Sequence, residues 1–238
     1  KNIMFVHQLC RQIWFYEMFF PLNLVGYLLE PLYLWLLNDR EVVTVSESTK
    51  KDLLRFGFKS DNVHVISEGI EMTPAENLES IQKFARPTIL ALGAIRSMKR
   101  THHIVKAFED VRRSIPDAHL VIAGEAEGKY GKRVLAQTKN SPYARDIEYC
   151  GRVGTAKKVE LLRKSHLLAV TSVKEGWGLI VTEANSQGTP AVVYDVDGLR
   201  DSVRDGETGI VCRKNTPECL AGNILKLFND DSVYANLR

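Results

Sequence analysis

The stretch of sequence that decides the fold is LLAVTSVKEGWGLIVTEA, residues 167–184. Its first part, Leu167–Thr171, is apolar or β-branched throughout, which predicts a strand that is buried on both faces. A loop with two glycines, Gly176 and Gly178, follows this strand, and the apolar residues from Leu179 onward predict a helix. A buried strand that leads through a glycine loop into a helix is the repeating unit of a parallel sheet covered on both faces.

The same alternation of strand and helix is predicted along the chain from residue 87. The further strands that we expect there are Thr88–Leu92, His119–Ala123, Ile147–Tyr149, Ala191–Tyr194 and Ile210–Cys212, with helices over Thr101–Ser114, Lys132–Lys139, Ala156–Lys164, Leu179–Ser186 and Pro217–Asn229.

A shorter α/β region precedes this pattern. It contains three predicted strands, Ile3–His7, Val42–Ser46 and Val63–Ile66, and a predicted helix, Ser48–Phe56. The polar segment Thr73–Arg86 has no β-branched run and is predicted to be a linker. We therefore expect an α/β fold of two Rossmann-like domains, an incomplete one over residues 1–86 that includes the linker and a second one over residues 87–238.

Composition excludes several classes of function. With 45% apolar and 26% charged residues, the 238-residue chain is typical of a globular protein with a real core, and a net charge of +3 without a Lys/Arg run argues against nucleic-acid binding. Cys10, Cys150, Cys212 and Cys219 are too far apart for a zinc site or a disulfide framework, so reduced thiols in a cytoplasmic protein are expected. Because the chain begins with Lys1 and at once reads as a strand, we expect it to begin inside a longer protein.

The most apolar segment is residues 12–37, in which Glu17 and Glu30 are the only charges. A membrane span needs about 20 apolar residues, and Pro21 and Pro31 are expected to break helices here, so a spanning helix is disfavoured. A pair of core helices is the expected structure. The alternative is an apolar surface that touches a membrane or a lipid-linked acceptor.

The loop after Thr171 contains the largest group of candidate ligand-binding residues. A sheet of this kind binds its ligand beyond the carboxyl ends of its strands. The helix that follows Gly176 and Gly178 offers free amide donors and a partial positive charge, which suit a phosphate. Glu175 in the loop and Glu183 one turn into the helix can face the same crevice, and each carboxylate can hold a sugar diol. One can take the ribose of a nucleotide and the other a transferred sugar.

At this point the sequence resembles a known family. Two glutamates separated by seven residues, followed by residues 188–192 (GTPAV), 197–201 (DGLRD) and 205–209 (DGETG), look like the signature of the family-4 retaining glycosyltransferases of group 1 type, which have the GT-B fold. Each motif alone is weak. Their order on a strand–helix background is specific.

The resemblance extends to both ends of the chain. Residues 93–100 (GAIRSMKR) resemble the family's loop for the donor diphosphate, where Lys99 matches the family's lysine. Ala94 stands where the family has an arginine, which leaves Arg96 as the residue that would reach the phosphates. His7 matches a histidine that faces the transferred sugar from the acceptor domain, and Glu68 stands where asparagine is common.

What the resemblance implies is transfer of a sugar from a nucleoside diphosphate sugar to a glycan or lipid-linked acceptor, with retention of configuration. Residues 1–86 would belong to the acceptor side and residues 87–238 to the donor side. No metal and no cofactor are expected, because cationic side chains and a helix end can neutralise the diphosphate. The implied catalytic residues are Glu175, His7 and Lys99, and the implied donor-binding residues are Gly93, Arg96, Lys99, Gly176, Trp177, Gly178, Leu179 and Glu183.

Within that set, Glu183 would bind the ribose and Glu175 the sugar hydroxyls, while Lys99 and the first amides of the helix would stabilise the leaving diphosphate. No protein nucleophile is named, because attack by the acceptor from the front face needs none. Two alternatives stay open. One is a glycan phosphorylase or nucleotide-sugar epimerase on the same scaffold, and the other is a nucleotide-binding module without catalysis.

Overall fold

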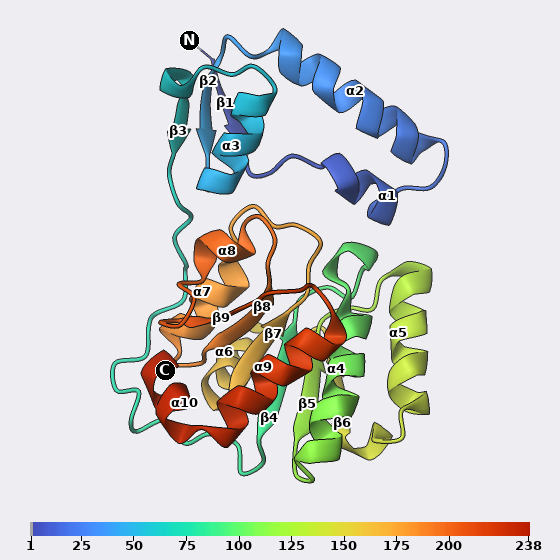
Figure 1. The fold of residues 1–238 in the computed structure, drawn as a ribbon, viewed down its shortest axis with the longest axis vertical. Coiled ribbons are helices and arrows are strands. Elements are labelled where there is room, and N and C mark those ends of the chain that lie inside the picture. The colour runs from blue at the N-terminus through green and yellow to red at the C-terminus, as the bar shows by residue number, and fades with distance from the viewer. Residues whose placement is uncertain (1) are drawn as a thin grey trace.

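A computed structural model of the chain describes residues 2–238 and contains two α/β domains, one above the other in Figure 1. The first domain has a parallel sheet of order β1-β2-β3. Its elements are β1 (Ile3–Val6), α1 (Trp14–Glu17), α2 (Leu22–Leu36), β2 (Glu41–Thr44), α3 (Glu47–Arg55) and β3 (Val63–Val65), with short 3-10 turns at Arg11–Ile13 and Ser60–Asn62.

The second domain has a six-stranded sheet of order β6-β5-β4-β7-β8-β9, in which every strand pair is parallel. Its strands are β4 (Thr88–Leu92), β5 (His119–Ala123), β6 (Ile147–Gly151), β7 (Leu167–Val170), β8 (Ala191–Tyr194) and β9 (Gly209–Cys212). Its helices are α4 (Thr101–Ser114), α5 (Gly128–Asn140), α6 (Thr155–Lys164), α7 (Leu179–Ser186), α8 (Leu199–Ser202), α9 (Pro217–Asn229) and α10 (Asp231–Leu237), with 3-10 turns at Ser97–Lys99 and Ala144–Asp146.

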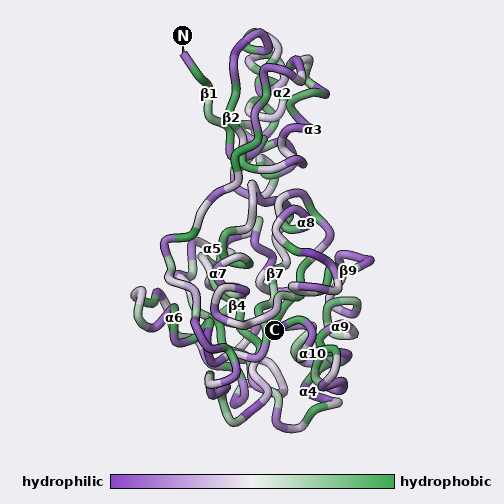
Figure 2. The backbone as a smooth tube through the Cα atoms, turned by 90° about the vertical axis from the view of Figure 1, so that its left-hand side faces the viewer, coloured by the Kyte–Doolittle hydropathy of each residue, from purple (hydrophilic) through white to green (hydrophobic). Residues whose placement is uncertain are grey.

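The sheet of the second domain is buried on both faces, as its apolar strands predicted. Helices α4 and α9 pack side by side on one face, and α6 lies on the other (Figures 1 and 2). Ile89, Leu90, Val192 and Val193 are fully buried between these layers. The doubly wound α/β architecture expected from the sequence is confirmed.

The strand order also positions the ligand site. Strand β4 pairs with β5 on one side and with β7 on the other. The chain adds β5 and β6 on one side of β4, then returns and adds β7, β8 and β9 on the other side, so the switch point of the sheet lies between β4 and β7. In open α/β sheets a crevice forms outside the carboxyl ends of the strands at such a point. The loops after β4 and β7 are those that carry Lys99 and Glu175.

The segment between the domains, residues 66–87, contains no helix or strand in the structure, which describes it completely. Much of it is fastened to the second domain. The backbone amide of Ala75 donates to the Ser186 carbonyl, and that of Phe84 donates to the Lys164 carbonyl. The half-buried Lys83 ammonium donates to three carbonyls, among them those of Ser165 and Gly188 at 2.8 and 2.9 Å.

One prediction for the first domain is wrong. Pro31 does not break a helix but lies inside α2. A proline cannot donate to the carbonyl four residues earlier, here that of Tyr27. Arg11 Nη1 donates to that carbonyl at 3.1 Å instead, which satisfies the oxygen and keeps the helix intact. Pro21 does mark a break, since it lies directly before α2.

The expected pair of core helices is also wrong. Only Glu30 and Leu34 of α2 are buried. The large apolar side chains of α2 that stay exposed in this chain are Leu22, Leu24, Val25, Leu28, Leu29, Leu32, Tyr33, Trp35 and Leu36. No helix within residues 2–238 is long and apolar enough to cross a membrane.

Candidate active site

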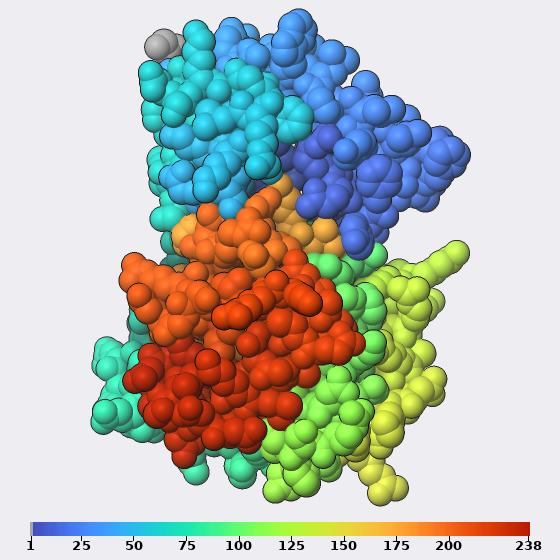
Figure 3. Space-filling view, in the orientation of Figure 1, coloured from blue at the N-terminus to red at the C-terminus, as the bar shows by residue number. Residues whose placement is uncertain are grey.

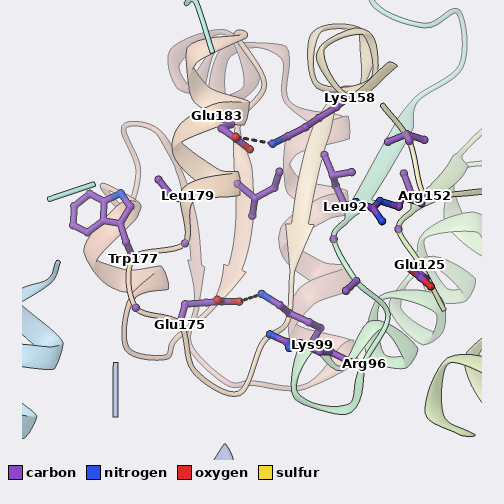
Figure 4. A pocket seen from close by; sticks show the side chains of 18 of the residues that line it. Leu92, Arg96, Lys99, Glu125, Arg152, Lys158, Glu175, Trp177, Leu179 and Glu183 are labelled. Atoms are coloured by element: carbon purple, nitrogen blue, oxygen red, sulfur yellow. Dashed lines mark hydrogen bonds and ion pairs between the residues drawn. The ribbon is translucent and has the colours of Figure 1, made fainter. Parts of the chain in front are cut away.

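A cavity of about 780 Å³ opens at the carboxyl ends of β4 and β7, where the two domains meet (Figures 3 and 4). All ten residues that the sequence singled out line it. They are His7, Gly93, Arg96, Lys99, Glu175, Gly176, Trp177, Gly178, Leu179 and Glu183. The structure therefore brings together every residue of the predicted set, while the role of each one stays a prediction.

The loop from β7 to α7 owes its shape to two glycines. Gly178 has φ +86°, a left-handed conformation that favours glycine, and lets the chain turn into α7. Gly176 is needed for a reason that the sequence did not indicate. A Cβ there would lie 2.6 Å from the His7 carbonyl oxygen, so the close approach at this glycine is to the backbone of the first domain.

Glu175 is held at one of its oxygens. Lys99 Nζ lies 2.5 Å from Oε1, and the Ser172 hydroxyl donates to the same atom at 2.5 Å. The Glu175 backbone amide donates to the Asp197 carbonyl at 3.0 Å. Both backbone and side chain are thus fixed, and the carboxylate faces the cavity beside the lysine (Figure 4).

Glu183 lies at the other end of the cavity in Figure 4, one turn along α7. Lys158 Nζ, from α6, lies 2.6 Å from its Oε1. Trp177 lies between the two glutamates in the sequence, and its indole Nε1 donates to the Thr182 hydroxyl at 3.0 Å. The ring is thereby tied to α7.

The loop after β4 is fixed against the loop after β7. Arg100 Nε and Nη2 donate to the carbonyls of Thr171 and Ser172 at 2.8 and 2.6 Å. The Thr171 hydroxyl donates back to the Lys99 carbonyl at 2.9 Å. Arg100 therefore joins the loop of Lys99 to the loop of Glu175, and burial lowers the pKa of its guanidinium.

Arg96 lines the same cavity, and its Nε is buried without a hydrogen-bond partner among residues 2–238. Buried donors are normally satisfied, so an unpaired guanidinium nitrogen beside a cavity is suited to an anionic ligand. Gly93 begins this loop with φ +131°.

His7 of the first domain and Glu68 of the segment between the domains close the cavity opposite the second domain. His7 Nδ1 lies 2.6 Å from Glu68 Oε1, and both residues line the cavity. Glu17 of α1 also reaches the second domain, because its Oε1 accepts a hydrogen bond at 2.8 Å from the Met98 amide, next to Lys99.

Sequence reasoning missed several residues of the cavity wall. Glu125 and Glu127 follow β5 and Arg152 follows β6. The rule that ligands bind beyond strand ends could have identified these three. Lys158 lies within a helix among other exposed lysines, and no local pattern distinguishes it.

Two histidines without a predicted role are structural. His102 and His103 contact the hydroxyls of Tyr130 and Tyr194 through Nδ1, each at 2.8 Å. Burial lowers the pKa of His103 to about 4, so this side chain is neutral at pH 7.

Within residues 2–238 no cluster of three His, Cys, Asp or Glu side chains is arranged to hold a metal, and metal independence stays a prediction.

Two domains with parallel sheets, a switch point in the second sheet and a cavity at the domain junction define the GT-B class of fold. A family model described as glycosyl transferases group 1 matches residues 76–238. The chain belongs to this family.

Relatives of known sequence support the assignment. The chain is 25% identical over 201 residues to glycogen synthase of Mycobacterium tuberculosis (strain H37Rv). The matched region covers 84% of this chain and 48% of that protein. It is 33% identical over 144 residues to poly(glycerol-phosphate) alpha-glucosyltransferase of Bacillus subtilis, covering 60% of this chain and 21% of that one. The chain thus spans about half the length of the glycogen synthase, and less of the second relative.

Solved structures share the fold. HepE of Anabaena, in complex with UDP and glucose, is matched over 99% of this chain and 64% of its own with a TM-score of 0.77 and 17% identity. Sucrose-phosphate synthase from Thermosynechococcus elongatus is matched over 99% of this chain and 60% of its own with a TM-score of 0.80 and 18% identity. At such identities the likeness concerns the fold alone.

Proposed function

We propose that this protein is a retaining glycosyltransferase that moves a sugar from a nucleoside diphosphate sugar to a glycan or lipid-linked acceptor. The observation that carries the proposal is the pair of carboxylates on either side of the α7 N-terminus. Glu175 and Glu183 face one cavity, and a lysine holds each of them. A diphosphate at the helix N-terminus would place a ribose towards one carboxylate and a sugar towards the other.

The cations of the cavity wall fit an anionic donor. They are Arg96, Lys99, Arg152 and Lys158, and five glutamates line the same cavity, namely Glu68, Glu125, Glu127, Glu175 and Glu183. Lys99 and Lys158 are each paired with a glutamate, so a diphosphate would share Lys99 with Glu175 or draw on the unpaired Nε of Arg96. Such charge-assisted bonds would tighten as negative charge develops on the leaving diphosphate.

The environment of Glu175 supports a binding role rather than a nucleophilic one. Its Oε1 accepts from both Lys99 and Ser172 and is already engaged, so only Oε2 is left for a ligand. We therefore assign Oε2 to the hydroxyls of the transferred sugar. The acceptor would attack from the same face as the leaving group, beside His7 of the first domain and Glu68 of the segment between the domains.

The acceptor is proposed to be a glycan or a lipid-linked glycan. The exposed apolar side chains of α2 are the feature that suits a lipid-linked acceptor or a membrane surface. Equal turnover with water-soluble and lipid-linked forms of one acceptor, with no binding to vesicles, would leave a soluble glycan as the substrate.

Titration of the protein with a panel of UDP-, GDP-, ADP- and TDP-sugars tests the proposal. One donor should bind at micromolar concentration and release its nucleoside diphosphate in the presence of acceptor, with the anomeric configuration kept. Turnover that depends on orthophosphate would indicate a phosphorylase instead. Binding without any turnover would indicate a nucleotide-binding module.

A further inference from the structure

Lys174, directly before Glu175, is buried and carries a charge that points away from the donor cavity. Only 2% of its surface is exposed, and it is absent from the cavity wall that Glu175 lines. Its Nζ makes ion pairs with Asp52 Oδ2 and, at 3.2 Å, with Asp197 Oδ2. A charge at such depth is costly unless it is paired, so this lysine depends on its two carboxylates.

The two partners belong to different domains. Asp52 lies on α3 of the first domain and is itself buried. Asp197 follows β8 of the second domain, and its carbonyl accepts the Glu175 backbone amide at 3.0 Å. One aspartate therefore supports both the Lys174 side chain and the Glu175 backbone, while the other connects them to the first domain.

A second contact joins α3 to the second domain close to Asp197. Asp201 Oδ1 accepts from the Ser48 amide in the first turn of α3 at 3.2 Å, and its Oδ2 accepts from the Gly198 amide at 2.9 Å. A carboxylate at a helix N-terminus is favourable because the free amides there carry partial positive charge. Helix α3 thus meets the second domain at Asp201 and, one turn later, at Lys174.

We propose that Asp52, Lys174 and Asp197 form an interdomain latch that places Glu175 for catalysis only when the first domain is closed on the second. Lys174 is a positioning residue in this latch. The inference rests on the proposed role of Glu175 in glycosyl transfer. No contact with the donor is needed, because the latch acts through the backbone that Lys174 shares with Glu175.

The charges allow the latch to open as well as close. On the first domain Arg55 Nη1 lies 3.1 Å from Asp52 Oδ1, and on the second Asp197 pairs with Arg200 as well as with Lys174. When the domains separate, Asp52 still pairs with Arg55 in the first domain, and Asp197 still pairs with Lys174 and Arg200 in the second. Opening therefore leaves no isolated buried charge, which is the condition under which such a contact can serve as a switch rather than as a permanent joint.

The test is a double-mutant cycle with Asp52→Asn and Lys174→Met in the whole protein. The nucleoside diphosphate of the best donor of the panel (UDP for a UDP-sugar) serves as the probe of binding by calorimetry, that donor gives kcat and KM, and X-ray scattering reports the separation of the domains. Asp52→Asn should lower kcat roughly 5- to 150-fold while UDP affinity stays within about 2-fold, and its radius of gyration should rise. The double variant should lose no more than Lys174→Met alone, and Asp52→Glu should restore part of kcat.

Asp61→Asn, at an exposed aspartate of the first domain, is the matched control and should change none of these values. Wild-type kcat and scattering in Asp52→Asn would overturn the latch, and so would a parallel fall of kcat, UDP affinity and melting temperature, which indicates a merely structural role. Failure of the wild-type protein to bind any nucleoside diphosphate would overturn the proposed function instead. Scattering of Asp52→Asn against wild type would then still decide whether this cluster holds the domains together.

Discussion

Lys99 and Glu175 come from loops after two different strands, β4 and β7, and their side chains meet with Nζ 2.5 Å from Oε1. Their side chains are largely withdrawn from solvent, with 27% and 15% exposed. The residue assigned to the diphosphate is thus in contact with the residue assigned to the sugar. An ammonium has three protons, so Lys99 can hold Glu175 and still donate to a phosphate oxygen. The predicted diphosphate site and the predicted sugar site therefore lie next to each other at this pair.

Lys99→Ala should weaken binding of the donor's nucleoside diphosphate (UDP if the panel selects a UDP-sugar) roughly 10- to 150-fold, because a hydrogen bond from a charged group contributes about 1.5–3 kcal/mol. The nucleoside alone (uridine in that case) lacks the diphosphate, so its affinity should change little. Calorimetry with both ligands measures the difference. Lys132→Ala, at an exposed lysine of α5, is the control. Equal losses for UDP and uridine would mean that Lys99 acts through folding, and an unchanged Arg96→Ala variant would mean that Ala94 marks a lost contact.

Gly176→Ala should disturb the junction of the domains rather than the donor side. The new Cβ would lie 2.6 Å from the His7 carbonyl oxygen, a backbone atom that cannot move alone. We expect kcat to fall and stability to drop by about 1–3 kcal/mol, as for other overpacked sites. Gly154→Ala is the matched control, because a Cβ there meets no atom within 4 Å. Thermal unfolding and kinetics with the best donor compare the two, and equal behaviour would show that the domains lie further apart in solution.

His166 should make the second domain sensitive to acid. Burial, with Lys83 and Arg238 nearby, lowers its pKa to about 4, and Nδ1 accepts the Thr88 amide at 3.0 Å. The unfolded chain binds a proton near pH 6.5 and the folded chain only near pH 4. Stability is therefore complete above pH 6.5 and falls by about 1–2 kcal/mol as the pH drops to 4, after allowance for partial exposure.

Denaturant unfolding at several pH values checks this, with His166→Gln expected to show a shallower loss between pH 6.5 and 4. His64→Gln, at an exposed histidine, is the control and should keep the contribution of His166 in full. A slope that is the same in His166→Gln and wild type would contradict the assignment of this proton.

The activity should survive a chelator. Cationic side chains and the α7 N-terminus are proposed to meet the phosphate charge, so EDTA should leave kcat with the best donor within about 2-fold. Loss of turnover in EDTA and its return with Mn²⁺ would contradict this mechanism. Assay of the same sample before and after dialysis against chelator makes the measurement.

The second domain could be predicted from the sequence because its signals are local. Thr88–Leu92, Thr101–Ser114 and Leu179–Ser186 were predicted with the bounds that the structure gives, since each has an unbroken periodicity and a clear end. Residues of the cavity could be named because strand ends and glycines mark them.

What the sequence could not predict depends on contacts between distant segments. The helix through Pro31 survives only because Arg11 satisfies the Tyr27 carbonyl, a contact over 16 residues. Lys158 joins the cavity because α6 packs beside α7, and the pairing of Lys174 with Asp52 spans 122 residues. No pattern along the chain carries such information.

The two glutamates of the cavity give the strongest test of the function, because they should fail in different ways. Glu183→Ala should weaken both UDP and the full donor roughly 10- to 150-fold, if Glu183 holds the ribose that both ligands share. Lys158→Met, which removes only the cation 2.6 Å from Glu183, is the companion variant and should have a smaller effect on the same ligands. Glu175→Ala should leave UDP binding almost unchanged while kcat collapses, because a contact to the sugar strengthens only as charge develops on it. Calorimetry with UDP beside steady-state kinetics with the full donor separates the two patterns. Normal binding and turnover in both alanine variants would remove the main support for glycosyl transfer at this cavity.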